Sequence, residues 1–254
     1  MSIFRMVWVV WTVVLCLGLS GCASLMLRPA EERMPSQVLQ AVEDGEGCTV
    51  VLLPGRFSKP EKFVEKGFLA ESVALRPDIE LIAADAHLGY YNDKTVVDRL
   101  REDVIQPLLD RNREVWLVGT SLGGLGSMIY TRAHPDHVTG AVLLGPFLGR
   151  EDLVQTLKDA GGPVAWDPSP TPERDTLEGL WLWIADTFGA EDADPPVEIR
   201  LGYGDKDRFL DATQVFETLL DPKDVVVAPG GHDWKVWRGL WAEMLERDMI
   251  CPSS

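Results

Sequence analysis

The sequence predicts an α/β fold, in which a mostly parallel sheet of about six strands carries helices on both faces. Short apolar runs rich in β-branched residues alternate with helix-length segments from residue 49 to residue 249. The runs are continuously apolar, which is typical of strands buried on both faces. No linker rich in Pro and Ser divides the 254 residues, so we expect one large domain over residues 48–254.

The chain begins with the pattern of an export signal. Arg5 precedes an almost uncharged apolar stretch over residues 6–19, and residues 19–22 read Leu-Ser-Gly-Cys. This ending resembles the bacterial lipoprotein signal, in which cleavage before the cysteine exposes Cys22 for lipidation. An uncleaved N-terminal anchor helix is the alternative, since both kinds of segment are short and apolar.

The lipoprotein reading divides the N-terminal region into a signal peptide over residues 1–21 and a polar tether over residues 22–47. Several acyl chains on one cysteine would form a stable membrane anchor. The expected location is then the bacterial cell envelope. Ala23 after the cysteine is compatible with the periplasm-facing outer membrane if the organism is Gram-negative.

The regular elements are expected in chain order, each bounded by Gly, Pro or Asp. A short helix is expected within the tether, at residues 36–43. The expected strands are 49–53, 79–84, 115–118, 140–144, 197–201 and 225–228. The expected helices between them are 60–75, 95–111, 122–133, 171–188, 210–220 and 233–249. In such a sheet, ligands bind at the carboxyl ends of the strands.

The third of these strands runs into Gly-Thr-Ser-Leu-Gly at residues 119–123. The spacing Gly-x-Ser-x-Gly between a strand and a helix predicts a sharp turn with strained backbone at the serine, where the glycines remove side chains that would clash. Ser121 would then project its hydroxyl from the sheet edge as a nucleophile. Leu122 would offer its N–H to an oxyanion at the start of the helix.

A serine hydroxyl needs a base with a pKa near 7 before it attacks efficiently. His232 is the best candidate, because it follows the last strand in a loop whose glycines let the imidazole bend back towards the serine. His87 lies at the same edge, where it could line the pocket, but it precedes the serine. His134 and His137 leave the nucleophile's own helix, and we expect them to be solvated turn residues rather than metal ligands.

The base needs a carboxylate that fixes its tautomer. The loop after the fifth expected strand supplies two, Asp205 and Asp207, and the carboxylate that does not serve the base would be a turn or cap acceptor. Between the fourth and fifth strands, residues 149–196 exceed the length of one crossover and contain several prolines and tryptophans. They are either a lid-like insertion over the active site or an ordinary helix with long flanks packed on the core.

Charge and cysteine usage narrow the class of protein. The formal charge is −16, and removal of Arg5 with the signal leaves 23 basic against 40 acidic residues, which argues against a nucleic-acid partner. Cys48 and Cys251 remain in the mature domain, and an oxidising compartment would allow them to pair, although the sequence does not fix their distance. No Cys-x-x-Cys motif or paired histidine spacing indicates a metal or another cofactor.

The order of Ser121, Asp207 and His232 on alternating strands and helices makes this chain resemble the α/β-hydrolases of the serine esterase and lipase type, over about residues 48–249. In that superfamily a Gly-x-x-Asp pattern is common after the penultimate strand, and Asp207 stands three residues after Gly204, which favours it over Asp205. The second oxyanion donor would come from Leu-Pro-Gly-Arg-Phe at residues 53–57, with the N–H of Arg56 preferred slightly over that of Phe57.

The resemblance implies a serine hydrolase that cleaves a carboxylic ester or thioester of a small molecule through an acyl-enzyme, without a cofactor and held at a membrane by the lipid on Cys22. Lipases, thioesterases, peptidases, acyltransferases and perhydrolases share this machinery, so the sequence leaves the substrate and the oligomeric state open. The aromatic residues Trp181 and Trp183 favour an apolar acyl group or form a core-facing stripe. The alternative from another class is a non-catalytic binding or assembly module on a hydrolase-like fold.

Overall fold

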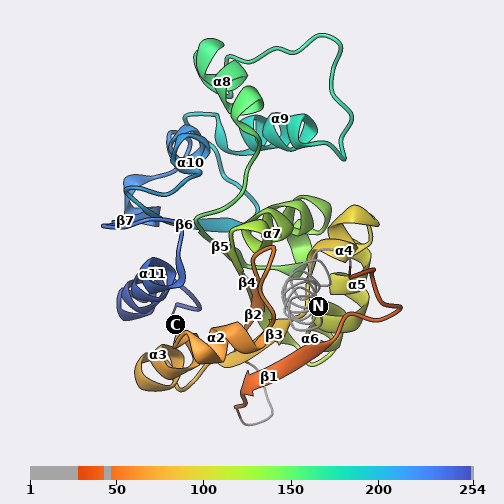
Figure 1. Cartoon of the computed structure of the whole chain (residues 1–254), viewed down its shortest axis with the longest axis vertical. Helices are drawn as coiled ribbons and strands as arrows, with labels where there is room; N and C mark the ends of the chain where they lie inside the picture. The colour runs from red at the N-terminus through yellow and green to blue at the C-terminus, as the bar shows by residue number, and fades with distance from the viewer. Residues whose placement is uncertain (1–27, 43–46, 253–254) are drawn as a thin grey trace, which may run out of the picture.

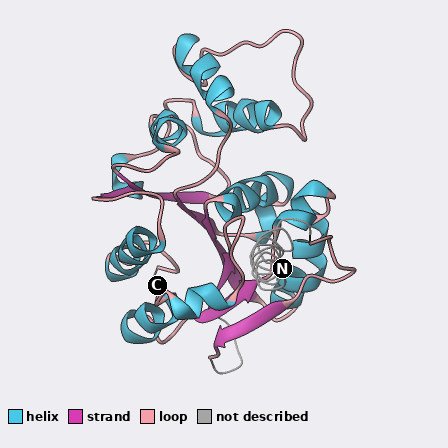
Figure 2. Ribbon diagram, viewed as in Figure 1, coloured by secondary structure: helices cyan, strands magenta, loops and turns pink. Residues whose placement is uncertain are grey.

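The computed structural model describes residues 28–42 and 47–252 and contains one twisted sheet of seven strands (Figures 1 and 2). The strands lie in the order β1-β3-β2-β4-β5-β6-β7. Their bounds are β1 Ser36–Gln40, β2 Gly47–Leu53, β3 Glu80–Ala84, β4 Arg113–Thr120, β5 Gly140–Leu144, β6 Glu198–Gly204 and β7 Val225–Ala228. All neighbours pair in parallel except β1, which runs antiparallel to β3. The predicted α/β class is therefore confirmed.

The helices follow the strands in the predicted alternation. Their bounds are α2 Glu61–Glu65, α3 Phe68–Leu75, α4 Leu88–Asn92, α5 Val96–Leu100, α6 Gln106–Leu109, α7 Leu122–Ala133, α8 Glu151–Asp159, α9 Leu177–Phe188, α10 Leu210–Glu217 and α11 Trp234–Glu246. A π-helical turn, Arg101–Ile105, joins α5 to α6. Short 3₁₀ turns occur at Pro135–His137 and Pro222–Asp224.

Two apolar cores cover the two faces of the sheet, because successive side chains of a strand point to opposite faces. On β2, Val50 and Leu52 pack in the core beneath α2, α3 and α11, whereas Val51 and Leu53 pack in the core beneath α4 to α10. Figure 1 shows these two groups of helices on opposite sides of the sheet. Burial on both faces explains why the strand sequences are continuously apolar.

The helix expected at residues 36–43 is wrong, because residues 36–40 form the edge strand β1. Val38 pairs with Ile82 in the antiparallel ladder, and the Gln40 side chain donates hydrogen bonds to the carbonyls of Arg76 (2.9 Å) and Ile79 (2.7 Å). These partners lie about forty residues away, so a local pattern could not reveal them. β1 also raises the strand number from the expected six to seven.

Four further helical features depart from the sequence pattern. The helix expected over residues 60–75 is divided at Gly67, whose φ of 90° lies in the left-handed region and ends the first piece. The short helix α4 and the insertion helix α8 were not predicted. The helix expected from residue 171 begins only at Leu177, after Thr176 caps its N-terminus by accepting a hydrogen bond from the Gly179 N–H.

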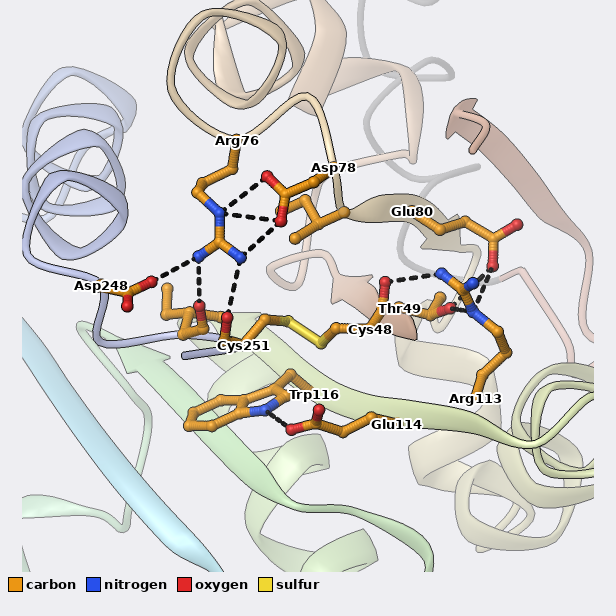
Figure 3. Close-up of a disulfide and its surroundings, with 12 residues drawn as sticks. Cys48, Thr49, Arg76, Asp78, Glu80, Arg113, Glu114, Trp116, Asp248 and Cys251 are labelled. Atoms are coloured by element: carbon orange, nitrogen blue, oxygen red, sulfur yellow. Dashed lines mark hydrogen bonds and ion pairs between the residues drawn. A yellow bond between two sulfur atoms is a disulfide. The ribbon is translucent and has the colours of Figure 1, made fainter. Parts of the chain in front are cut away.

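A disulfide joins Cys48 on β2 to Cys251 after the last helix, with 5.8 Å between the Cα atoms, which resolves the pairing that the sequence left open (Figure 3). Beside it, the Arg76 guanidinium donates to the carbonyls of Ile250 (3.0 Å) and Cys251 (2.8 Å) and pairs with Asp248. Both features fasten the end of the chain at the amino edge of the sheet, opposite the edge that carries Ser121.

The proposed signal peptide and Cys22 lie outside the described residues. Among the helices of the described ranges, none combines the length and the apolar character that crossing a membrane would need.

Candidate active site

Ser121 occupies the turn between β4 and α7 with φ 53° and ψ −112°, a conformation that costs free energy for a residue with a side chain. Close backbone contacts hold the turn. A Cβ atom at Gly119 would lie 2.1 Å from the Gly123 carbonyl oxygen, and one at Gly123 would lie 2.0 Å from that of Leu53. Both glycines of the Gly-x-Ser-x-Gly pattern are therefore required, as the sequence predicted.

Hydrogen bonds with the end of β5 and with the loop after it fix the backbone of this serine. The Ser121 N–H donates to the carbonyl of Leu144 at the end of β5 (3.0 Å), and the Ser121 carbonyl accepts from the Phe147 N–H (3.0 Å). The side chain is nearly buried, at 6% exposure. The hydroxyl is thus held at a defined point on the carboxyl edge of the sheet.

His232 lies within hydrogen-bond distance of both predicted partners. Its Nε2 atom is 2.9 Å from the Ser121 hydroxyl oxygen, and its Nδ1 atom is 2.8 Å from Oδ2 and 2.9 Å from Oδ1 of Asp207. These residues are separated by 111 and 25 positions in the chain. An Nδ1–H donated to Asp207 leaves Nε2 free to accept the serine proton.

The two aspartates of the β6 loop have different surroundings. Asp207 is 4% exposed, and its Oδ1 also accepts the Phe209 N–H (2.8 Å), which fixes the carboxylate beside the imidazole. Asp205 is exposed and accepts the Gly230 N–H (2.8 Å), so it holds the loop that carries His232. The structure therefore assigns the turn-acceptor role to Asp205.

Aromatic rings and a glycine around the imidazole were not identified from the sequence as part of the site. The rings of Phe209 and Trp237 meet the His232 ring edge to face at centroid distances of 4.9 and 4.8 Å. Gly145, with φ 53°, leaves room for these groups, since a Cβ there would lie 2.7 Å from Oδ2 of Asp207. A Gly-Pro pair directly after a buried strand was the only signal for Gly145, and nothing local links Phe209 or Trp237 to a histidine in another loop.

The residues expected to provide oxyanion donors also lie beside Ser121. Leu122 is the first residue of α7, so its N–H has no acceptor four residues earlier within that helix. Gly55 brings the loop after β2 against Ser121, because a Cβ at Gly55 would lie 3.4 Å from that of Ser121. Arg56, the next residue, is exposed at this rim with its guanidinium over the ring of Phe57.

Among the described residues, the hydrogen bonds and ring contacts of the other three histidines involve none of Ser121, Asp207 and His232. His87 is 5% exposed, and its Nδ1 accepts the Gly89 N–H (3.1 Å) at the start of α4; burial lowers the pKa of this imidazole. His134 and His137 stack on each other beside Tyr130 at the far end of α7. Within the described ranges, no group of three or more His, Cys, Asp or Glu side chains is arranged to hold a metal ion.

A pocket of about 500 Å³ adjoins Asp207 and Phe209. Its wall combines the β6 loop with residues 149–155 at the start of the insertion, including Arg150 and Glu151. Trp181 of the insertion is fully buried instead, and its Nε1–H donates to the Leu148 carbonyl (2.7 Å). Trp181 is therefore a core residue, as the alternative of a core-facing stripe predicted. It gives no support for a pocket that favours an apolar acyl group.

A family model described as "Putative esterase" matches residues 89–247, which include Ser121, Asp207 and His232. The chain belongs to this esterase family. A search of curated proteins found no matching sequence for this esterase.

Solved structures resemble this esterase over most of its length. An S-formylglutathione hydrolase from Staphylococcus aureus has a TM-score of 0.60 at 14% identity, covering 85% of this chain and 98% of its own. A ferulic acid esterase has a TM-score of 0.56 at 14% identity, covering 85% and 97%. A fluorophosphonate-binding serine hydrolase from Staphylococcus aureus has a TM-score of 0.52 at 15% identity, covering 85% and 97%. The esterase therefore has the α/β-hydrolase fold.

Proposed function

We propose that this esterase is a serine hydrolase that cleaves carboxylic esters or thioesters of small molecules through an acyl-enzyme, with Ser121 as nucleophile, His232 as base and Asp207 as orienting acid. The observation that carries the proposal is the imidazole of His232, which lies 2.9 Å from the Ser121 hydroxyl and 2.8 Å from the Asp207 carboxylate. Hydrogen-bond contact from nucleophile to base and from base to carboxylate is the arrangement that activates a serine.

In the first half of the reaction, the Ser121 oxygen attacks the substrate carbonyl while Nε2 of His232 takes the hydroxyl proton. Asp207 stabilises the imidazolium that forms and holds the ring in the tautomer that leaves Nε2 unprotonated at the start. The imidazolium then returns the proton to the departing alcohol or thiol. The acyl group remains on Ser121 as an ester.

In the second half, water attacks the acyl-enzyme. His232 removes a proton from that water and later protonates the Ser121 oxygen, which releases the carboxylic acid and restores the enzyme. In both halves the tetrahedral oxyanion accepts hydrogen bonds from the N–H groups of Leu122 and Arg56. The N-terminus of α7 adds a favourable partial positive charge at the same place.

The membrane anchor belongs to the proposal as well. A lipid on Cys22 would hold the catalytic domain at the bacterial cell envelope, facing the periplasm from the outer membrane if the organism is Gram-negative. The Cys48–Cys251 disulfide supports an oxidising compartment, since such bonds persist outside the reducing cytosol. A variant with Cys22→Ser should lose metabolic labelling by fatty acid, whereas labelling that persists would contradict Cys22 as the lipid site.

Substitution of the nucleophile tests the catalytic proposal. Ser121→Ala should lower kcat for p-nitrophenyl esters by about 10⁶-fold, because the triad acts as one unit. A fluorophosphonate probe should label the unaltered protein and leave the Ser121→Ala variant unlabelled. Hydrolysis that survives in that variant would remove Ser121 as the nucleophile. Absence of both labelling and hydrolysis in the unaltered protein would instead support the non-catalytic binding module.

A further inference from the structure

The segment just after the proposed lipid site is bound to the catalytic domain. We call residues 28–35 the docked segment. The Met34 N–H donates to Asp103 (2.8 Å), the Ala30 N–H donates to Asp93 (3.1 Å), and the Glu32 carbonyl accepts from Arg99 (2.7 Å). The side chain of Met34 is 3% exposed within the core. Residues 28–40, which the sequence analysis assigned to the tether, therefore contact the domain directly.

The docked segment meets the domain at the edge of the sheet that carries the active site. Arg28 forms a salt bridge with Asp85, the residue that follows β3. A Cβ at Gly89 would lie 2.2 Å from the Arg28 carbonyl oxygen, so α4 packs directly on this part of the chain. Only β2 separates β3 from β4, which ends beside Ser121. At the usual strand spacing, the ends of β3 and β4 are about 10 Å apart.

The chain between the lipid site and this point is short. Six residue steps separate Cys22 from Arg28. Even fully extended, they span only about 21 Å. A lipid on Cys22 would therefore keep Arg28, which lies at the carboxyl edge of the sheet, within about 21 Å of the lipid site.

The loop beside Arg28 has the composition of a membrane-interface contact. We call residues 55–59 the rim loop. Phe57 is 50% exposed, which is unusual for so large an apolar side chain, and the Arg56 guanidinium lies 5.0 Å from the centre of its ring. Lys59 shares a hollow of about 180 Å³ with Arg28 and Asp85. Within the described part of the chain, no carboxylate forms an ion pair with Arg56 or Lys59.

We propose that the rim loop contacts the lipid bilayer to which the chain is anchored, so that the active-site edge faces the membrane and the substrate is an ester presented at the bilayer surface. This inference rests on the proposed serine hydrolase function and its lipid anchor. Phe57 inserts among the headgroups, and the two cations pair with lipid phosphates. Two cations without an ion-pair partner, beside the point where the tether joins the domain, suit the phosphate groups of lipids.

The orientation is measured by quenching of a fluorophore by headgroup-nitroxide lipids. The full-length lipidated protein is reconstituted in vesicles of phosphatidylethanolamine and phosphatidylglycerol, with the fluorophore on Phe57→Cys or on Val73→Cys. Val73 is the matched control, because it is 54% exposed and lies on α3 near the opposite edge of the sheet. Cys48 and Cys251 are joined in the disulfide and do not compete for the label.

Quenching at residue 57 should exceed quenching at residue 73 several-fold. Equal quenching, or stronger quenching at residue 73, overturns the inference. A Gly/Ser insertion between Ser24 and Leu25 should lower hydrolysis of a vesicle-borne ester several-fold relative to a water-soluble one, and an unchanged ratio also contradicts the inference.

The two proposals fail separately in these measurements. Hydrolysis of p-nitrophenyl acetate in detergent reports the triad alone, and quenching reports the orientation alone. Absence of hydrolysis with preserved quenching would refute the serine hydrolase proposal, whereas normal hydrolysis with equal quenching would refute only the orientation.

Discussion

Gly145 leaves the space that the Asp207 carboxylate occupies: a methyl group on its Cα would lie 2.7 Å from Oδ2 of Asp207. The same methyl group would be 2.9 Å from Nε1 of Trp237 and 3.3 Å from Nδ1 of His232. The residue that follows β5 thus shapes the space in which the Asp207 carboxylate and the His232 imidazole meet, although neither residue belongs to that strand.

We expect Gly145→Ala to lower kcat by about 10²-fold, because the methyl group displaces the carboxylate from the imidazole. Its φ of 53° adds backbone strain. Gly162→Ala is the control, since Gly162 has φ +113° and nothing within 4 Å of its Cβ position, so it carries strain without a clash. The kcat values are measured by steady-state kinetics on p-nitrophenyl butyrate. Equal losses of kcat in the two variants would contradict the prediction that the clash at Gly145 lowers activity.

Asp207→Asn should lower kcat by about 10⁴-fold, because an amide in place of the carboxylate favours the wrong imidazole tautomer and leaves the imidazolium unstabilised. Asp205→Asn is the matched control: the amide oxygen can still accept the Gly230 N–H, so activity should stay within a few-fold of the unaltered protein. A larger loss in the Asp205 variant would reverse the assignment of the two aspartates. Circular dichroism would verify that both variants fold.

Cys251→Ser should lower the free energy of unfolding by about 2–5 kcal/mol, because the bond closes a loop of 203 residues and restricts the unfolded chain. The double variant Cys48→Ser/Cys251→Ser should lose the same amount, which separates loss of the bond from effects of a lone thiol. At temperatures where the variants remain folded, kcat should change little, since the bond lies at the edge opposite Ser121. Urea unfolding curves that coincide with those of the unaltered protein would contradict this prediction.

Protonation of His87 should lower the stability of the folded protein as the pH falls. Burial holds the pKa of this imidazole below its usual 6.5, so the unfolded chain takes up a proton that the folded protein excludes. Its contribution is therefore fully present above about pH 6.5 and is lost as the pH falls from there towards the folded pKa. His87→Asn, which keeps an acceptor for the Gly89 N–H without a titrating ring, should lose less thermal stability from about pH 7 to about pH 5.

The pKa of His134 is also lowered, mainly by burial, and this residue titrates in both proteins, so the difference between them reports His87. Melting temperatures that fall in parallel with pH in both proteins would show that His87 contributes nothing to acid sensitivity.

The prediction from sequence was accurate where a local pattern carried the information. Apolar runs bounded by turn residues gave the six parallel strands, and Gly-x-Ser-x-Gly gave the turn at Ser121. The edge strand β1 and the docked segment were missed, since their partners on β3, α4 and the π-helical turn lie far along the chain. The choice between Asp205 and Asp207 rested on a family pattern, because both residues occur in one loop.

The sequence by itself determined the alternation of strands and helices and the chain order of serine, aspartate and histidine. The alternation depends on patterns among residues that are close in the sequence, and the chain order can be taken directly from the sequence. Only the tertiary structure decided the convergence of His232, Asp207 and Ser121, the place of Gly145 beside the carboxylate, and the attachment of residues 28–35 at the sheet edge that carries Ser121. Those contacts join strand ends and loops that are distant in sequence, and sheet order and packing alone bring them together.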